Sequence, residues 1–164
     1  MLKKIIAWWA IIMVAGLACS CAKREPAQSP ASEVLAGKIS AQFREFNASL
    51  EKDKAEELFD EDNRTDFSKI ENFFVRQSKQ GEVGAFKLYS DSNVEYVREL
   101  ASNRILKLQG EADNLEKQHV ANNAEVRSYG NYVYYAAHER KDEIFKIIED
   151  TLRCAPQDKK DKKV

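Results

Sequence analysis

The sequence predicts an all-α fold: a three- or four-helix bundle dominated by a long C-terminal antiparallel helical hairpin. Three observations support this prediction. Apolar residues recur at intervals of three and four through residues 33–155, which is the period of an amphipathic helix. The two longest such stretches lie at the C-terminal end, and the short connection between them makes their helices antiparallel neighbours. No alternation of apolar and polar residues is long enough to predict a sheet.

The first predicted helix begins at Ser32 and covers about 25 residues. Its apolar stripe consists of Leu35, Ile39, Phe43, Phe46 and Leu50, continued less regularly by Leu58 and Phe59. Residues 60–65 contain acids and an asparagine without apolar side chains, which predicts a connecting turn. A second helix is predicted from Phe67, where Ser68 and Glu71 are spaced as a capping box.

This second helix is expected to end near Gly81, because Gly81 and Gly84 favour a break. The apolar residues that follow fit either a short helix or an extended segment. We expect a helix or a loop over residues 81–91.

The last two helices form the predicted hairpin. Ser92 and Glu95 are spaced as a capping box at the start of the first one. Its apolar positions alternate steps of three and four, as in an interhelical seam; they are Val94, Val97, Ala101, Ile105, Leu108, Ala112 and Leu115. Asn122 and Glu125 predict a capped start for the second, which Pro156 ends. The apolar positions of this last helix are Val126, Tyr129, Val133, Ala136, Ala137, Ile144, Ile147, Ile148 and Leu152.

The first 18 residues have the order of a secretory signal peptide. Lys3 and Lys4 provide a positive end, residues 5–14 form an apolar core, and small residues precede Cys19. This segment resembles the lipobox of bacterial lipoproteins, in which the cysteine accepts a diacylglycerol thioether and its freed amine is acylated. Gly16 departs from the pattern, because the family usually has leucine or a similar residue there.

Three alternatives to a lipid on Cys19 stay open. A second lipobox, residues 18–21, would place the lipid on Cys21. Residues 5–22 form an uncharged run close to the roughly 18 residues at which spanning becomes possible, which allows a permanent transmembrane anchor. Cleavage by the ordinary signal peptidase, without lipid, is the third. The weakly hydrophobic end of the run favours cleavage, and the adjacent cysteines favour lipid.

The lipoprotein resemblance divides the chain into four parts. They are a signal peptide (1–18), the lipidated cysteine with a flexible tether (19–32), the helical bundle domain (33–155) and a disordered lysine-rich tail (156–164). Pro26 and Pro30 stand in the tether, which has no apolar periodicity. The resemblance implies the outer membrane, facing the periplasm, because Ser20 replaces the aspartate associated with inner-membrane retention. The tail is expected to be a solvated end, with weak contact to anionic polymer or lipid as the alternative.

Composition and motifs argue against several kinds of chemistry. The chain has 26 basic and 27 acidic residues and a formal net charge of −1, so no positive field attracts nucleic acid. It lacks a phosphate-binding glycine loop, a dinucleotide fingerprint, a haem-attachment motif and an HExxH pair. Glu116 and His119 match one Glu-x-x-His motif of a di-iron bundle, but the second copy is missing. His138 and Asp142 are too few ligands for a site. We expect no metal, no cofactor and no enzymatic activity.

Two further groups of residues are candidate sites. If the lipid is on Cys19, Cys21 is free to form a disulfide with Cys154, although a free thiol or a bond to a partner chain stays open. The tyrosines surround Gly130, and consecutive helical positions cannot all face one core. At least one ring is therefore expected to bind a partner, unless all four pack in the bundle; they are Tyr129, Tyr132, Tyr134 and Tyr135.

Together these features predict a non-catalytic envelope lipoprotein whose tethered helical domain binds a protein partner or an assembly in the periplasm. The alternative is a periplasmic bundle that binds a small ligand or a metal, or that senses envelope stress.

Overall fold

The computed structural model describes residues 31–60 and 65–154. In this part of the chain, four strands form one antiparallel sheet in the order β1-β2-β4-β3. The strands are β1 (Ile70–Ser78), β2 (Gly81–Leu88), β3 (Glu125–Tyr129) and β4 (Tyr132–Ala137). The helices are α2 (Ser32–Gln42), α3 (Lys52–Glu57), α4 (Val94–Glu111), α5 (Leu115–Asn122) and α6 (Lys141–Cys154), with short 3₁₀ helices η1 (Arg44–Phe46), η2 (Phe67–Lys69) and η3 (Asp91–Asn93). The all-α prediction is therefore wrong: the fold is α+β.

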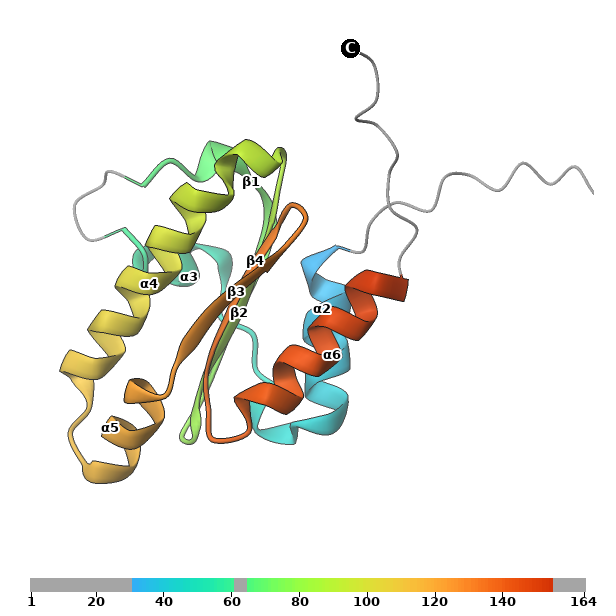
Figure 1. Cartoon of the computed structure of the whole chain (residues 1–164). Helices are drawn as coiled ribbons and strands as arrows, with labels where there is room; N and C mark the ends of the chain where they lie inside the picture. The colour runs from blue at the N-terminus through green and yellow to red at the C-terminus, as the bar shows by residue number, and fades with distance from the viewer. Residues whose placement is uncertain (1–30, 61–64, 155–164) are drawn as a thin grey trace, which may run out of the picture.

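Helices cover both faces of the sheet (Figure 1). On one face lie α2 and α6, where Ile39 and Ile148 pack with Val83 of the sheet. On the other face lie α3 and α4, where Val97 packs in the same apolar cluster as Phe86. The domain thus has three layers, with the sheet in the middle and a separate apolar core on each side of it.

The two central strands, β2 and β4, are buried along nearly their whole length. Each has a neighbouring strand on both sides and helices on both faces. Val83 and Tyr134 belong to the core under α2 and α6, whereas Phe86 and Tyr135 belong to the core under α4. Strands buried on both faces consist of near-continuous apolar runs instead of alternating patterns. The missing alternation therefore did not exclude a sheet.

The predicted C-terminal hairpin of two long helices is wrong: α4 and α6 pack on opposite faces of the sheet, and the first part of the second predicted helix forms strands. β3 and β4 form a hairpin, and α6 begins only at Lys141. Tyr129 pairs with Tyr132, which leaves Gly130 and Asn131 as a two-residue turn. Gly130 has a φ of 54°, in the left-handed region that glycine occupies without steric cost. This two-residue glycine-asparagine connection is itself a hairpin signal.

Two other predicted segments also differ. The predicted second helix is the short helix η2 followed by β1, and residues 81–88, expected to be helix or loop, are β2. The first predicted helix ends at Gln42, so the stripe beyond it is divided between shorter segments. Ser32, assigned to the tether, is the first residue of α2. The helix predicted from Val94 is confirmed as α4 up to Glu111; its last two predicted apolar positions, Ala112 and Leu115, lie beyond the end of α4.

The predicted signal peptide, lipidation site and tail lie outside the described residues. Within the part of the chain that the structure describes, no helix combines the length and the apolar character needed to cross a membrane.

Candidate functional site

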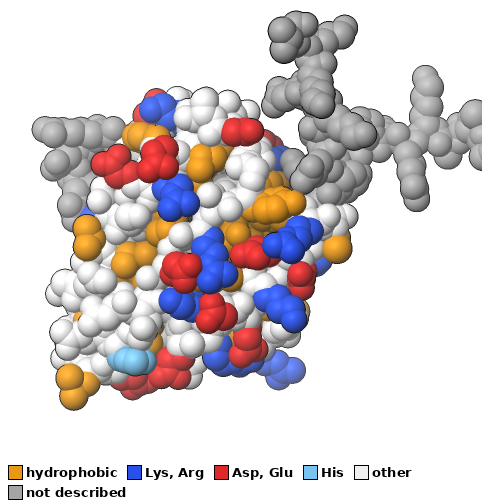
Figure 2. Space-filling model, in the orientation of Figure 1, with side chains coloured by type: hydrophobic (Ala, Val, Ile, Leu, Met, Phe, Trp, Pro, Cys, Tyr) orange, Lys and Arg blue, Asp and Glu red, His pale blue; other side chains and the backbone are white. Residues whose placement is uncertain are grey.

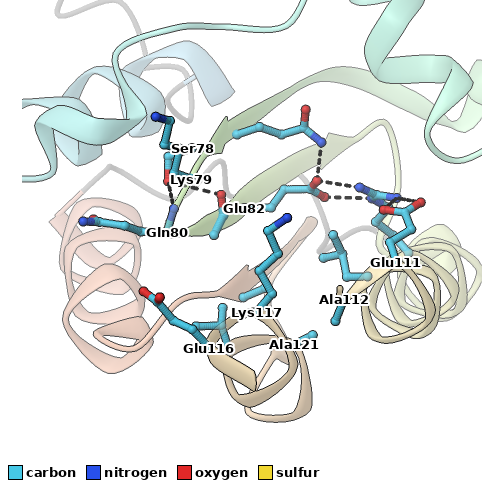
Figure 3. Close-up of a pocket in the computed structure, with 15 residues that line it drawn as sticks. Ser78, Lys79, Gln80, Glu82, Glu111, Ala112, Glu116, Lys117 and Ala121 are labelled. Carbon is cyan, nitrogen blue, oxygen red and sulfur yellow. Dashed lines mark hydrogen bonds and ion pairs between the residues drawn. The ribbon is translucent and has the colours of Figure 1, made fainter. Parts of the chain in front are cut away.

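A pocket of about 280 Å³ opens at the end of the sheet where β2 begins (Figure 3). Three elements surround it: the turn between β1 and β2, the C-terminal end of α4, and α5. Its apolar wall comes from the two helices and consists of Leu108, Ala112, Val120 and Ala121. Its polar lining comes from the turn and from charged side chains of both helices. The volume is near the lower end of the range for small-molecule sites.

Glu82 and Arg104 form a buried ion pair at this pocket, with side chains only 2% and 3% exposed. Glu82 Oε1 accepts hydrogen bonds from Arg104 Nε at 2.9 Å and from the Tyr135 hydroxyl at 2.6 Å. Glu82 Oε2 accepts from Arg104 Nη2 at 2.8 Å and from Gln77 Nε2 at 2.6 Å. A carboxylate offers about four lone-pair positions. The four donors therefore satisfy Glu82, which removes much of the cost of burying its charge.

Two glycines make this arrangement possible. Gly84 pairs with Tyr135 across β2 and β4, and a Cβ at Gly84 would lie 2.4 Å from the tyrosine ring. Gly81 has a φ of 152°, and a Cβ there would lie 1.9 Å from the carbonyl oxygen of Ala137. Glycine at position 84 leaves room for the ring of Tyr135 beside β2, and the Tyr135 hydroxyl donates to Glu82.

Two groups of the buried cluster, Tyr135 and Arg104, have raised pKa values. Burial raises the pKa of Tyr135 well above its ordinary value, and the carboxylate of Glu82 raises it further. Burial alone would lower the pKa of Arg104, but the hydrogen bonds and charge of Glu82 outweigh this effect and raise the pKa. Both groups therefore stay protonated at neutral pH. Their N–H and O–H donors are therefore available to hold Glu82 in place.

Flexible charged side chains form the rest of the polar lining. Arg104 Nη1 donates to Glu111 at 3.3 and 3.4 Å, and the Glu111 side chain is 60% exposed. Lys117 points from α5 into the pocket (Figure 3) and pairs with Asp113 at 2.9 Å. The charged residues that line the pocket are Lys79, Arg104 and Lys117, and Glu82, Glu111 and Glu116. The lining thus has equal numbers of basic and acidic side chains.

Three of the four tyrosines named as possible partner-binding residues are in the core. Tyr132 is 4% exposed, Tyr134 1% and Tyr135 0%. The Tyr134 hydroxyl donates to Glu149 at 3.3 Å, beneath α6. Tyr129, at the end of β3, is partly buried and packs against the core. The structure therefore does not present the tyrosines as one exposed group.

Neither the two histidines nor Cys154 are among the residues that line the pocket. His138 is buried against the rings of Phe43 and Phe46, and its Nε2 lies 3.5 Å from Glu45. Asp142, its predicted neighbour in a ligand pair, forms an ion pair with Arg127. His119 is exposed, while Glu116 lines the pocket. No group of three or more His, Cys, Asp or Glu side chains in the described ranges could hold a metal ion.

Cys154 is exposed at the end of α6. Cys19 and Cys21 are outside the described residues, so the lipid and the disulfide stay predictions.

A second charged cluster lies between β3 and α6. Arg127 stacks over the ring of Phe145 and pairs with Glu125 at 2.7 Å, Asp142 at 3.2 Å and Glu149 at 3.4 Å. Figure 2 shows acidic and basic side chains interleaved on the face that includes these elements. Mixed signs of this kind stabilise the packing of α6 on the sheet and do not create a field of one sign.

The sequence analysis did not identify Glu82 or Arg104. Arg104 follows Val97 and Ala101 in the apolar stripe of α4 and precedes Leu108 at the same spacing, so it occupies a core position. Glu82 is likewise an acid at the start of an apolar segment. A charged residue at a core position normally needs a buried partner, and this rule was the available signal.

Comparisons of the chain with family models, with curated proteins and with solved structures found no match.

Proposed function

We propose that this chain is a lipid-anchored, non-catalytic binding protein of the bacterial cell envelope, and that a small ligand occupies the pocket between the β1–β2 turn, α4 and α5. The leading observation is the buried pair of Glu82 and Arg104 at this pocket. Its hydrogen bonds hold polar groups in fixed positions beside an apolar wall, which is the usual composition of a ligand site.

The energetics of the pair support recognition over simple stabilisation. Replacing a buried ion pair by well-packed apolar residues is often neutral or stabilising. Among the ion pairs of the described residues, this is the one in which both side chains are almost fully buried. A charged pair retained beside an open pocket is consistent with a role in binding.

The protonation states support binding over catalysis. Arg104 and Tyr135 both have raised pKa values, and every lone-pair position of Glu82 has a donor. General acid-base catalysis needs a group whose pKa lies near the working pH. We therefore favour a ligand site without chemistry, and prefer it to the predicted protein interface because three of the tyrosines are in the core.

Ligand binding can be tested by thermal melting of the full chain, purified from membranes in detergent. The panel contains amino acids, short carboxylic acids, sugars and nucleosides. Ala112 lines the pocket, so Ala112→Phe should abolish the increase in melting temperature that any ligand of the panel produces. Ala41→Phe, at an exposed position of α2, is the matched control and should keep it. A panel without effect, or effects that persist in Ala112→Phe, would contradict the pocket.

The anchor is a separate part of the proposal. We expect the intact mass of the mature protein from bacterial membranes to show an acylated chain that begins at Cys19. Cys19→Ala should lose the acyl mass, whereas Cys21→Ala should keep it. An unmodified or uncleaved chain would contradict the lipid anchor and would leave the pocket proposal standing.

A further inference from the structure

This inference rests on the proposed function and concerns the class of ligand. The guanidinium of Arg104 has two unequal sides. Nε and Nη2 donate to Glu82 at 2.9 and 2.8 Å, the usual length for a charge-assisted hydrogen bond. Nη1 reaches the carboxylate of Glu111 only at 3.3 and 3.4 Å. Arg104 thus has one donor group that is buried and only loosely paired.

Glu111 is the side chain that a ligand can displace. It is the last residue of α4, so its side chain can move without breaking the helix. Its side chain is 60% exposed, and exposed ion pairs contribute little because water competes for both partners. Glu82 cannot leave in the same way, because four donors hold it in the buried cluster.

Lys117 supplies a second positive group. Its side chain extends from α5 into the pocket (Figure 3), and the carboxylate that pairs with it, on Asp113, is 67% exposed. An anion that enters the pocket can therefore meet Arg104 on one side and Lys117 on the other. The apolar wall of Leu108, Ala112, Val120 and Ala121 lies beside these charges and suits a short aliphatic body.

We infer that the ligand is a small monocarboxylate whose carboxylate replaces that of Glu111 on Arg104, with its aliphatic part against α4 and α5. Charge balance favours this class over phosphate. One carboxylate exchanges for another, so the charge beside Arg104 is unchanged. A phosphate dianion would add a negative charge next to Glu82, and an unpaired charge in a buried place is costly.

The test uses the full chain, purified in detergent and labelled with ¹³C at its alanine methyl groups. Three pocket residues, Ala112, Ala121 and Ala137, then report occupancy directly by NMR. The probes are isovalerate, its uncharged amide isovaleramide, and inorganic phosphate. Isovalerate should shift these three methyl signals, and isovaleramide and phosphate should leave them in place. Shifts produced by the amide or by phosphate, but not by isovalerate, would overturn the inference and leave the pocket as a site for another ligand.

Substitutions test the exchange at Arg104. Glu111→Gln should bind isovalerate roughly fivefold more tightly, because the internal competitor is weakened. Lys117→Gln should bind it roughly fivefold more weakly, since one partner of the carboxylate is lost. Glu99→Gln on the exposed side of α4 and Lys146→Gln on α6 are matched controls that should not change the affinity. Weaker binding by Glu111→Gln would show that Glu111 itself contacts the ligand, which contradicts displacement.

Discussion

Gly84 determines whether Tyr135 can reach Glu82 in the buried cluster beside the pocket. Its partner across the sheet, Tyr135, occupies the space that a side chain at position 84 would need. The hydroxyl of Tyr135 is one of the four donors to Glu82. A single residue without a side chain in β2 therefore controls the position of a ring in β4 and the hydrogen bonding of the buried carboxylate.

We expect Gly84→Val to lower the free energy of unfolding by about 1–3 kcal/mol, because an added Cβ forces the Tyr135 ring away from β2. Urea denaturation followed by circular dichroism measures this loss. Gly110→Ala is the control: position 110 is exposed within α4 and has open space for a Cβ. That substitution should raise the stability by about 0.5–1 kcal/mol. Equal effects of the two substitutions would contradict the role of Gly84.

His138 makes stability depend on pH. Burial lowers its pKa below the ordinary value of 6.5, against the opposing attraction of Glu45. Its Nδ1 accepts a hydrogen bond from the backbone of Arg140 at 3.1 Å, which needs an unprotonated nitrogen. As the pH falls through 6.5, the unfolded chain takes up a proton before the folded chain does. The contribution of His138 is therefore complete above pH 6.5 and decreases below it.

We expect the urea midpoint of the unmodified chain to decrease when the pH is lowered from 7 to 5. In His138→Asn, whose side-chain oxygen can still accept from Arg140, the midpoint should change less over this interval. The carboxyl groups with lowered pKa values, such as Glu125 and Glu143, lose their contribution only nearer pH 4.5, so they do not interfere. A variant with the same pH dependence as the unmodified chain would assign the effect to another group.

At the scale of elements, the hairpin of β3 and β4 supplies β4, one of the two central strands of the sheet. Its turn has only two residues, and Asn131 fastens it to the end of β2: Asn131 Nδ2 donates to the Leu88 carbonyl at 2.7 Å, and the Leu88 N–H donates to the Asn131 carbonyl at 2.8 Å. The turn therefore fixes the register of β4 against both of its neighbours, including the pairing of Tyr135 with Gly84.

The conformation of Gly130 predicts a difference between two substitutions. At a φ of 54°, Gly130→Val should cost about 1–2 kcal/mol, because a β-branched residue is strained in the left-handed region. Gly130→Asn should cost clearly less, since asparagine adopts this region more readily. Apart from its chain neighbours, no atom of the described residues lies within 4 Å of a Cβ at this position, so packing does not complicate the comparison. Thermal melting of both variants measures the difference, and equal losses would argue against strain.

At the scale of the whole molecule, two apolar cores share one sheet. Neighbouring residues of β2 point in opposite directions, so Ala85 belongs to the core under α2 and α6 while Phe86 belongs to the core under α4. Either layer of helices can leave only by exposing one face of the same strands to water. The three layers should therefore unfold together.

This cooperativity can be measured with one substitution in each core. Ile148→Ala on α6 and Ile105→Ala on α4 each remove a buried side chain and should cost about 2–5 kcal/mol. Each variant should still show a single transition, with helix content and tyrosine fluorescence changing at the same urea concentration. Lys146→Ala, at an exposed position of α6, should shift the midpoint little. Two separate transitions in Ile148→Ala would show that the layer of α2 and α6 unfolds independently.

The sequence by itself determined the features that depend on local period and order. The helical spacing correctly predicted α4, and the apolar positions of the last helix from Ile144 onward lie in α6. The signal-like leader and its cysteines stay predictions from residue order alone. These features can be recognised in sequence because an amphipathic helix places its apolar face at fixed intervals.

Only the tertiary structure decided the sheet and the candidate site. β2 and β4 are covered by helices on both faces, so their residues have no period that separates a strand from a helix. The partners Glu82, Arg104 and Tyr135 come from three elements that are distant along the chain, and their contact depends on the register of β2 against β4 and on the position of α4. A charged residue at a core position signals that a buried partner is needed. Which residue is that partner depends on non-local register, and register leaves no pattern in a single sequence.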